Sequence, residues 1–280
     1  MRRKLAGLRV LVTGASQGIG RALVVEAARR GCKVLAAARS ADLLDELAQE
    51  VRKSGGTVEP VVADVADPAD RQAMLDAANR HFGGLDILVN NAGIGATGHF
   101  MDTKPETLRH IFEVNYFALC EMVRLFLPTL RRGTTPAIVN ISSVLGRRAW
   151  PARSMYSASK FAVQGFSEAL RAELLADGID VTVISPGLTR TNFSKNLLEN
   201  KAKLSLDHRR GMTAEQVATA TWNAVEARWM DVTLSAGGKA LVLLTRCFPG
   251  LIDFFARRKV RQLFAAEIAD RERSAGRGAG

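Results

Sequence analysis

Tyr156 and Lys160 are the residues of this chain whose types and spacing most directly suggest chemistry. On a helix, residues four positions apart lie on one face. A phenol has an ordinary pKa of about 10, and an ammonium group held beside it favours the phenolate and lowers that pKa. The pair could therefore transfer a proton at neutral pH, although Tyr and Lys also fall at this spacing by chance in many helices.

The glycine-rich segment 13–20 is a second chemical feature, because it follows the apolar run 8–12 and opens a predicted helix. Glycines at positions 14, 18 and 20 would let the backbone approach a pyrophosphate, whose charge suits a helix N-terminus. The spacing differs from the wider Gly-x-Gly-xx-Gly fingerprint and from a P-loop. We expect a dinucleotide here, with a glycine turn needed only for tight packing as the alternative.

The end of the second predicted strand indicates which dinucleotide binds. A protein that binds NAD usually places an acid here to hold the ribose 2′-hydroxyl. This chain instead has Ala38, Arg39 and Ser40. Arg39 could face a 2′-phosphate with Ser40 as a neutral donor, or it could be an ordinary surface arginine. The missing acid favours NADP(H), with NAD(H) as the second choice.

Alternating short apolar runs and longer amphipathic runs must position these residues. Strands are predicted at 8–12, 33–38, 58–63, 85–90, 137–142, 180–184 and 231–234, and helices at 18–30, 41–53, 69–82, 105–131 and 154–177. Strands rich in Val, Leu and Ile on both faces are typical of a parallel sheet covered by helices. The predicted fold class is α/β, with a single Rossmann-like doubly wound parallel sheet of about seven strands flanked by helices. Ligands of such sheets bind beyond the carboxyl ends of the strands.

Over residues 7–235 these motifs together resemble the short-chain dehydrogenase/reductase (SDR) family. Segments 13–20, 90–93 and 186–191 resemble the family's cofactor turn, the element that closes its fourth strand and the segment that borders the nicotinamide. The cofactor-binding positions that the resemblance implies are Gly14, Ser16, Gln17, Gly18, Ile19, Gly20, Arg39, Ser40, Asp64, Val65, Asn91, Ala92, Gly93, Tyr156, Lys160, Pro186, Gly187, Leu188, Thr189 and Thr191.

The resemblance also implies catalytic roles for Asn115, Ser143, Tyr156 and Lys160. Tyr156 would exchange a proton with the substrate oxygen, and Lys160 would lower the pKa of the phenol and hold the nicotinamide ribose. Ser143 would hydrogen-bond the oxygen where charge develops, and Asn115 would position a water. Two alternatives stay open: Ser142 could face the site instead of Ser143, and Asn115 could only satisfy backbone groups in a helix kink.

The C-terminal third is expected to select the substrate. Segment 191–210 is a predicted lid with apolar candidates at Phe193, Leu197, Leu198, Leu204 and Leu206, although a core-facing helix is equally compatible. Such a lid suits a hydrophobic lipid-, steroid- or acyl-like alcohol or ketone. We divide the chain into an SDR domain at 1–235, a helical extension at 236–268 and a frayed tail at 269–280.

The extension combines apolar residues with cations. Pro249 should break any continuous helix within it, and the part that follows carries four cations among apolar side chains. This composition fits an interfacial helix, so peripheral membrane contact through residues 239–264 is one prediction. A helix docked on its own domain or on a partner subunit is the other.

Composition excludes several classes of protein. With 280 residues, 47% of them hydrophobic, the chain can bury a sizeable core. The net charge is +11, but no basic patch is interleaved with stacking aromatics, so no nucleic-acid binding is expected. Cys32, Cys120 and Cys247 show no metal-type spacing, so no metal is predicted and all three are expected to be buried thiols in a reducing compartment. Neither a signal peptide nor a spanning helix is evident, which favours the cytoplasm.

The sequence thus predicts an NADP(H)-dependent oxidoreductase that interconverts a carbonyl and a secondary alcohol. A catalytically silent NADP-binding sensor or scaffold of the same fold is the alternative, although such proteins typically lose the tyrosine or the lysine that this chain retains. The resemblance further implies a homodimer or homotetramer formed through the helices that contain Asn115 and Tyr156.

Overall fold

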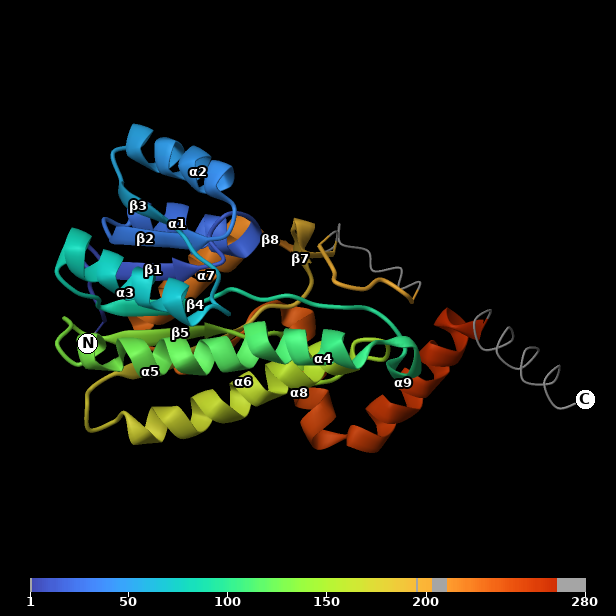
Figure 1. The fold of residues 1–280 in the computed structure, drawn as a ribbon. Coiled ribbons are helices and arrows are strands. Elements are labelled where there is room, and N and C mark those ends of the chain that lie inside the picture. Colours follow the sequence, from blue (N-terminus) through green and yellow to red (C-terminus); the bar gives the residue numbers. More distant parts are fainter. Residues whose placement is uncertain (1, 195, 203–210, 266–280) are drawn as a thin grey trace, which may run out of the picture.

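The computed structural model describes residues 2–194, 196–202 and 211–265, and in this part of the chain seven parallel strands form one sheet (Figure 1). Their order is β3-β2-β1-β4-β5-β6-β9. The strands are β1 (Arg9–Thr13), β2 (Lys33–Ala38), β3 (Thr57–Val62), β4 (Ile87–Asn90), β5 (Ala137–Ile141), β6 (Asp180–Ser185) and β9 (Asp231–Thr233). Two short strands, β7 (Thr189–Arg190) and β8 (Met212–Thr213), pair separately. The predicted doubly wound α/β fold is confirmed.

Helices cover both faces of the sheet (Figure 1). Helices α1 (Gly18–Arg29), α2 (Ala41–Lys53) and α7 (Ala214–Ala227) pack on one face, and α3 (Pro68–Phe82), α5 (Ala118–Leu130) and α6 (Ser154–Glu173) pack on the other. Helix α4 (Pro105–Phe112) and the one-turn helices η1 (Phe100–Asp102), η3 (Val144–Gly146) and η4 (Asn192–Ser194) lie in the connections. Apolar strand residues on both faces of the sheet are therefore buried, as their composition predicted.

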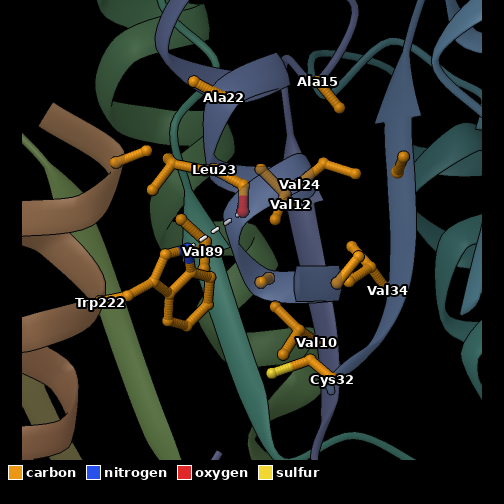
Figure 2. Packing of buried hydrophobic residues seen from close by; sticks show 14 of the residues in the cluster. Val10, Val12, Ala15, Ala22, Leu23, Val24, Cys32, Val34, Val89 and Trp222 are labelled. Atoms are coloured by element: carbon orange, nitrogen blue, oxygen red, sulfur yellow. Dashed lines mark hydrogen bonds between the residues drawn. The ribbon is translucent and has the colours of Figure 1, made fainter. Parts of the chain in front are cut away.

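Helix α7 is absent from the elements predicted above, although it packs along α1. Its Trp222 is fully buried among Leu23, Val10 and Val12, and the indole N–H donates to the Leu23 carbonyl oxygen at 3.0 Å (Figure 2). A capping box between Thr213 and Gln216 begins the helix. That pattern, Thr-x-x-Gln before an apolar run, is the sequence signal that could have found it.

The single helix predicted over 105–131 is interrupted. A π-helical segment, η2 (Glu113–Phe117), joins α4 to α5 and turns Asn115 into the core. Such a wide turn places one extra residue in the helix, and these insertions frequently occur at functional sites. Helix α6 also ends earlier than predicted, at Glu173.

The C-terminal extension forms two helices, α8 (Ala236–Cys247) and α9 (Pro249–Leu263), with Pro249 at the first position of α9 as expected. Figure 1 shows this pair of helices extending from the body of the molecule beyond α6. Just after α9, Phe264 is 1% exposed and packs against Ala152 and Ala202. No helix among the described residues is long and apolar enough to cross a membrane.

The prediction that all three cysteines are buried is wrong. Cys32 is buried and Cys120 partly so, but Cys247, the last residue of α8, is exposed. The lid candidates Leu204 and Leu206, and the tail at 269–280, lie outside the described residues. The division of the chain at residue 235 stays an interpretation, and α8 begins at Ala236.

Candidate active site

The glycine turn between β1 and α1 packs closely against neighbouring backbone. Gly14 has φ +65°, and a Cβ there would lie 2.9 Å from the Ala92 Cα. A Cβ on Gly20 would collide with the Gly14 carbonyl oxygen. Asn91 holds the turn from β4, donating from Nδ2 to the carbonyl oxygens of Thr13 (2.9 Å) and Gly14 (3.2 Å).

This turn fits a dinucleotide. Ser16 and Gln17 precede α1, which begins with Gly18 and Ile19. Gln17 is the N-cap of the helix, but its side chain accepts no hydrogen bond from the first backbone N–H groups. The first N–H groups of a helix need acceptors, and a pyrophosphate supplies them where glycines allow close approach. Asn91 therefore shapes the turn, and the backbone of the turn is the surface offered to the phosphates.

Arg39 lies at the end of β2 with an exposed guanidinium, and its Nη1 is 3.7 Å from Asp64 Oδ2 after β3. Ser40 is the exposed N-cap of α2, and its side chain makes no capping hydrogen bond. Val65 is buried beside them. An exposed cation and a hydroxyl donor are thus available at the strand end where the adenosine ribose binds in sheets of this type.

Tyr156 and Lys160 lie in the first half of α6, as the sequence predicted, with the Lys160 Nζ 5.9 Å from the centroid of the phenol ring. Lys160 is buried, and its Nζ donates to the Ile141 carbonyl oxygen at the end of β5 (2.9 Å). Burial lowers the pKa of Lys160 to about 8. The ammonium group is therefore easily deprotonated, and an additional acceptor near Nζ would stabilise its charged form.

Ser143, rather than Ser142, faces Tyr156. The Ser142 hydroxyl is buried, donates to the Lys160 carbonyl oxygen at 3.2 Å and accepts from Gln164 Nε2 at 3.1 Å. Ser143 accepts a hydrogen bond from Leu145 N and lies close enough to the phenol of Tyr156 to lower its pKa. Ser142 thus connects α6 to the end of β5 through hydrogen bonds, whereas Ser143 lies at the reactive hydroxyl.

Asn115 joins the π-helical segment to the loop after β4. Its Oδ1 accepts from Ile94 N (2.8 Å), and its Nδ2 donates to Ile94 O (3.0 Å) and Ser159 Oγ (3.0 Å). A Cβ on Gly93 would lie 3.2 Å from Asn115 Oδ1 and 3.5 Å from Lys160 Nζ. Asn115 therefore does satisfy backbone groups at a kink, and it does so directly beside Lys160.

The pKa of Tyr156 differs from the sequence expectation. Burial raises it, and the groups that oppose this effect are Ser143, through its hydrogen bond, and Arg153, through its charge, rather than Lys160. Arg153 lies three residues before Tyr156 and is only 7% exposed. Sequence reasoning missed this residue, although a basic side chain one helical turn from a reactive phenol is a recognisable signal.

The start of the predicted lid covers the phenol. The rings of Phe193 and Tyr156 lie 5.6 Å apart with a 57° tilt. Phe193 and Leu197 also lie over Gly95, where a Cβ would be 3.0 Å from the Phe193 ring. Leu198 pairs with Gly95 through its backbone, and its own side chain is exposed. Apolar side chains thus form the wall of the site opposite the glycine turn.

The segment after β6 closes the remaining side. Val144 N donates to Pro186 O (2.9 Å), and a Cβ on Gly187 would lie 2.9 Å from the hydroxyl of Ser235, which caps α8. Thr191 approaches the glycine turn, because a Cβ on Gly18 would lie 3.3 Å from its methyl group. Leu188 and Thr189 connect these two contacts. The predicted cofactor segments 13–20, 91–93 and 186–191 therefore border one space at the carboxyl edge of the sheet.

Comparisons with known proteins show the family to which this chain belongs. Residues 9–202 match the protein family described as short chain dehydrogenase. Dehydrogenase/reductase SDR family member 7B of Mus musculus is 36% identical over 251 residues, which cover 86% of this chain and 78% of that protein.

Solved structures are similar over most of the chain. A short chain dehydrogenase/reductase from Burkholderia phymatum in complex with NAD matches with a TM-score of 0.81 and 28% identity, over 89% of this chain and 96% of that one. A 3-ketoacyl-(acyl-carrier-protein) reductase from Brucella melitensis, complexed with NADH, has a TM-score of 0.73 and 28% identity over 82% of this chain and 98% of its own.

Proposed function

Because this chain belongs to the short-chain dehydrogenase/reductase family, and is thus an NAD(P)-dependent oxidoreductase, we propose that it uses NADP(H) to interconvert a carbonyl and a secondary alcohol on an apolar substrate. The observation that carries the proposal is the closeness of the Ser143 side chain to the Tyr156 phenol, next to the buried Lys160. Ser143 follows β5, whereas Tyr156 and Lys160 lie on α6, and the three meet at the edge of the sheet where the glycine turn fits a dinucleotide.

Tyr156 is the proposed acid and base. In the direction of reduction its hydroxyl gives a proton to the substrate oxygen, and Ser143 donates a hydrogen bond to the same oxygen as negative charge develops there. The nicotinamide cofactor supplies the hydride when bound. Burial disfavours the phenolate, and Ser143 and the charge of Arg153 oppose that effect by lowering the pKa of Tyr156.

Lys160 and Asn115 have supporting roles in this proposal. Lys160 holds the nicotinamide ribose with the donors that it does not give to Ile141. Asn115 fixes the π-helical segment against Ile94 and keeps space beside Gly93 for a water that links Lys160 to solvent. The remaining predicted cofactor residues position the phosphates, the adenosine and the nicotinamide along the carboxyl edge of the sheet.

The preference for NADP(H) rests on Arg39 and on the absence of an acid at the end of β2. An exposed guanidinium gives a 2′-phosphate a charge-assisted partner, whereas the 2′-hydroxyl of NAD would find no carboxylate at positions 38–40. The apolar substrate is supported by Phe193 and Leu197 against Tyr156.

A spectrophotometric assay tests this function. NADPH oxidation should be followed with apolar ketones, aldehydes, steroids and 3-oxoacyl compounds, and the reverse reaction with the corresponding alcohols. Turnover with one of these classes supports the proposal. Tight NADPH binding without turnover on any carbonyl or alcohol would instead support the alternative, a silent cofactor-binding sensor or scaffold.

We also propose that the α8–α9 extension binds an anionic membrane surface from the cytoplasm. Its exposed apolar side chains are Leu243, Leu244, Phe248, Leu251, Phe254 and Phe255. Exposed cations at Arg246, Arg257, Arg258 and Arg261 accompany them. Apolar groups that enter the headgroup region and cations that attract anionic lipids together produce interfacial binding.

Flotation with phosphatidylcholine vesicles, with and without phosphatidylglycerol, tests this contact. Replacing Leu251, Phe254 and Phe255 with Ser should abolish binding to anionic vesicles. Leu175→Ser, which changes an exposed apolar side chain near the end of α6, should leave it unchanged. The alternative is that this surface binds a second copy of the chain. In that case the parent would not bind vesicles, and the triple variant would lose self-association.

For the oligomer we propose a homodimer or homotetramer that buries α5 and α6. Phe117, immediately before α5, and Phe161, on α6, expose 51% and 44% of their surfaces, which is unusual for phenylalanine. Sedimentation of the parent and of a Phe117→Ser, Phe161→Ser double variant tests this assembly. The parent should sediment as a dimer or tetramer and the variant as a smaller species.

A further inference from the structure

Arg153 is a buried cation that the proposed reaction does not fully explain. Its side chain leaves the N-cap position of α6, one turn before Tyr156, and only 7% of the residue is exposed. Among the described residues the guanidinium has no hydrogen-bond partner and no ion pair, and its Nε is completely shielded from solvent. A buried charge is costly unless it is paired, so an unpaired one needs a reason.

Within the part of the chain that the structure describes, no carboxylate lies near Arg153 to neutralise it. Burial lowers the pKa of Arg153, and the group that opposes this effect is Tyr156. The buried Arg3 differs in this respect, because it donates to Asp180 Oδ2 at 2.6 Å and to backbone oxygens. The structure thus pairs Arg3, whereas Arg153, beside Tyr156, has no such partner among the described residues.

Arg153 is enclosed by a segment that lies far from it in sequence. Gly98 N donates to Ala152 O at 3.0 Å, which brings segment 97–98 against the residue before Arg153. Buried polar groups are satisfied in most folded proteins, so the unsatisfied Nε of Arg153 indicates that a ligand completes it.

We propose that Arg153 binds an oxoanion, a carboxylate or a phosphate ester, that the substrate carries close to the carbonyl reduced at Tyr156. Arg153 lies one helical turn before Tyr156, so its guanidinium can meet an oxoanion that is bonded close to a carbonyl held between Tyr156 and Ser143. Guanidinium binds both oxoanions through paired N–H donors, and the bond strengthens where water is excluded. Phe193 and Leu197 supply the apolar wall, so the substrate is an amphiphile with an acidic group near its ketone.

This inference rests on the proposed function, and matched substrates test it. The first pair is 4-oxodecanoate and its methyl ester, and the second is a long-chain 1-hydroxy-2-alkanone phosphate and the free hydroxyketone. The protein should prefer the anionic member of at least one pair by about 10- to 100-fold in kcat/KM, as expected for a charge-assisted hydrogen bond. The pair that shows the larger ratio identifies the oxoanion.

Two variants and a control test whether Arg153 causes the preference for the anionic substrate. Arg153→Met should reduce the anionic-to-neutral ratio to about one, and Arg153→Lys should keep part of it, because ammonium retains the charge but not the fork of donors. Arg124→Met, which changes an exposed arginine on α5, should keep the full ratio. If Arg153 acted only on the phenol, Arg153→Met would shift the pH profiles of both members alike and leave the ratio unchanged, which overturns the proposal.

A binding measurement separates this inference from the proposed function. Decanoate and decyl phosphate, compared with decanol, should raise the melting temperature of the parent but not that of Arg153→Met, whether or not any carbonyl is turned over. Because Met removes an unpaired buried charge, this variant should melt no lower than the parent. A parent that shows less than threefold preference in both substrate pairs overturns the proposal whatever the variants do.

Discussion

Lys160 lies one helical turn after Tyr156 with its Nζ 5.9 Å from the centroid of the phenol ring, and it reaches back to bond the Ile141 carbonyl oxygen. The two side chains thus share one face of α6 at the end of β5. Lys160 is almost fully buried, so its charge is held at a cost to the stability of the protein. Function, rather than folding, explains a cation at this position.

Lys160→Met should stabilise the cofactor-free protein below pH 8. The folded pKa of Lys160 is about 8 and the unfolded pKa is about 10.4, so the parent gains stability as the pH rises between these values. The advantage of the variant should therefore shrink by up to about 3 kcal/mol between pH 8 and 10. Urea unfolding at several pH values measures it. A difference that is independent of pH would contradict the burial of a charged lysine.

Arg39→Asp should shift cofactor selectivity from NADPH toward NADH. An aspartate at the end of β2 repels a 2′-phosphate and accepts from a 2′-hydroxyl, so the ratio of kcat/KM values should change by about 10- to 100-fold in each direction. Lys53→Asp, at an exposed position at the end of α2, is a matched charge control. A parent enzyme that already uses NADH better would show that our interpretation of Arg39 is wrong.

Phe193→Ala should weaken substrate binding more than it slows the chemical step. The ring lies against Tyr156 and over Gly95, and loss of its apolar contact should raise KM for an apolar ketone about 10-fold. Steady-state kinetics with a short and a long ketone measure this, and the effect should grow with chain length. Leu175→Ala, at an exposed apolar position, should change neither constant.

Phe264→Ala should release α9 from the sheet domain. Phe264 is buried against Ala152 and Ala202 and lies 4.6 Å from the His99 ring, and it is the largest buried side chain after α9 among the described residues. Trypsin should then cleave faster after Arg257 and Arg258, while the main thermal transition changes little. Phe254→Ala, on the exposed side of the same helix, is the control, and equal cleavage rates in the two variants would argue against docking through Phe264.

The sequence predicted those features that local patterns determine. Alternating apolar runs predicted the parallel sheet, and the glycines at 14, 18 and 20 predicted a turn whose backbone a pyrophosphate can approach; a Cβ on Gly14 or Gly20 would collide with neighbouring backbone. A kink at Asn115 was one of two alternatives, and the sequence could not decide between them because the kink depends on hydrogen bonds to Ile94 in the loop after β4. Tertiary contacts with α6 likewise determine which of Ser142 and Ser143 faces Tyr156.

Arg153 illustrates the same limit for the site. Its type and position suggest only an exposed arginine at a helix start. Its burial arises because segment 97–98 packs against Ala152, and Phe264, more than a hundred residues later, packs there as well. The surroundings of Arg153 depend on contacts between three segments that are distant in sequence, and the spacing of one motif does not predict such contacts.

The most direct test of the account is Tyr156→Phe, because this change removes the one hydroxyl that the mechanism requires and keeps the ring that packs against Phe193. Turnover of the best carbonyl substrate with NADPH should fall by about 10²- to 10⁴-fold. NADPH affinity, measured by fluorescence titration, should stay within a few-fold of the parent. A variant that retains turnover close to the parent's would contradict proton transfer by Tyr156.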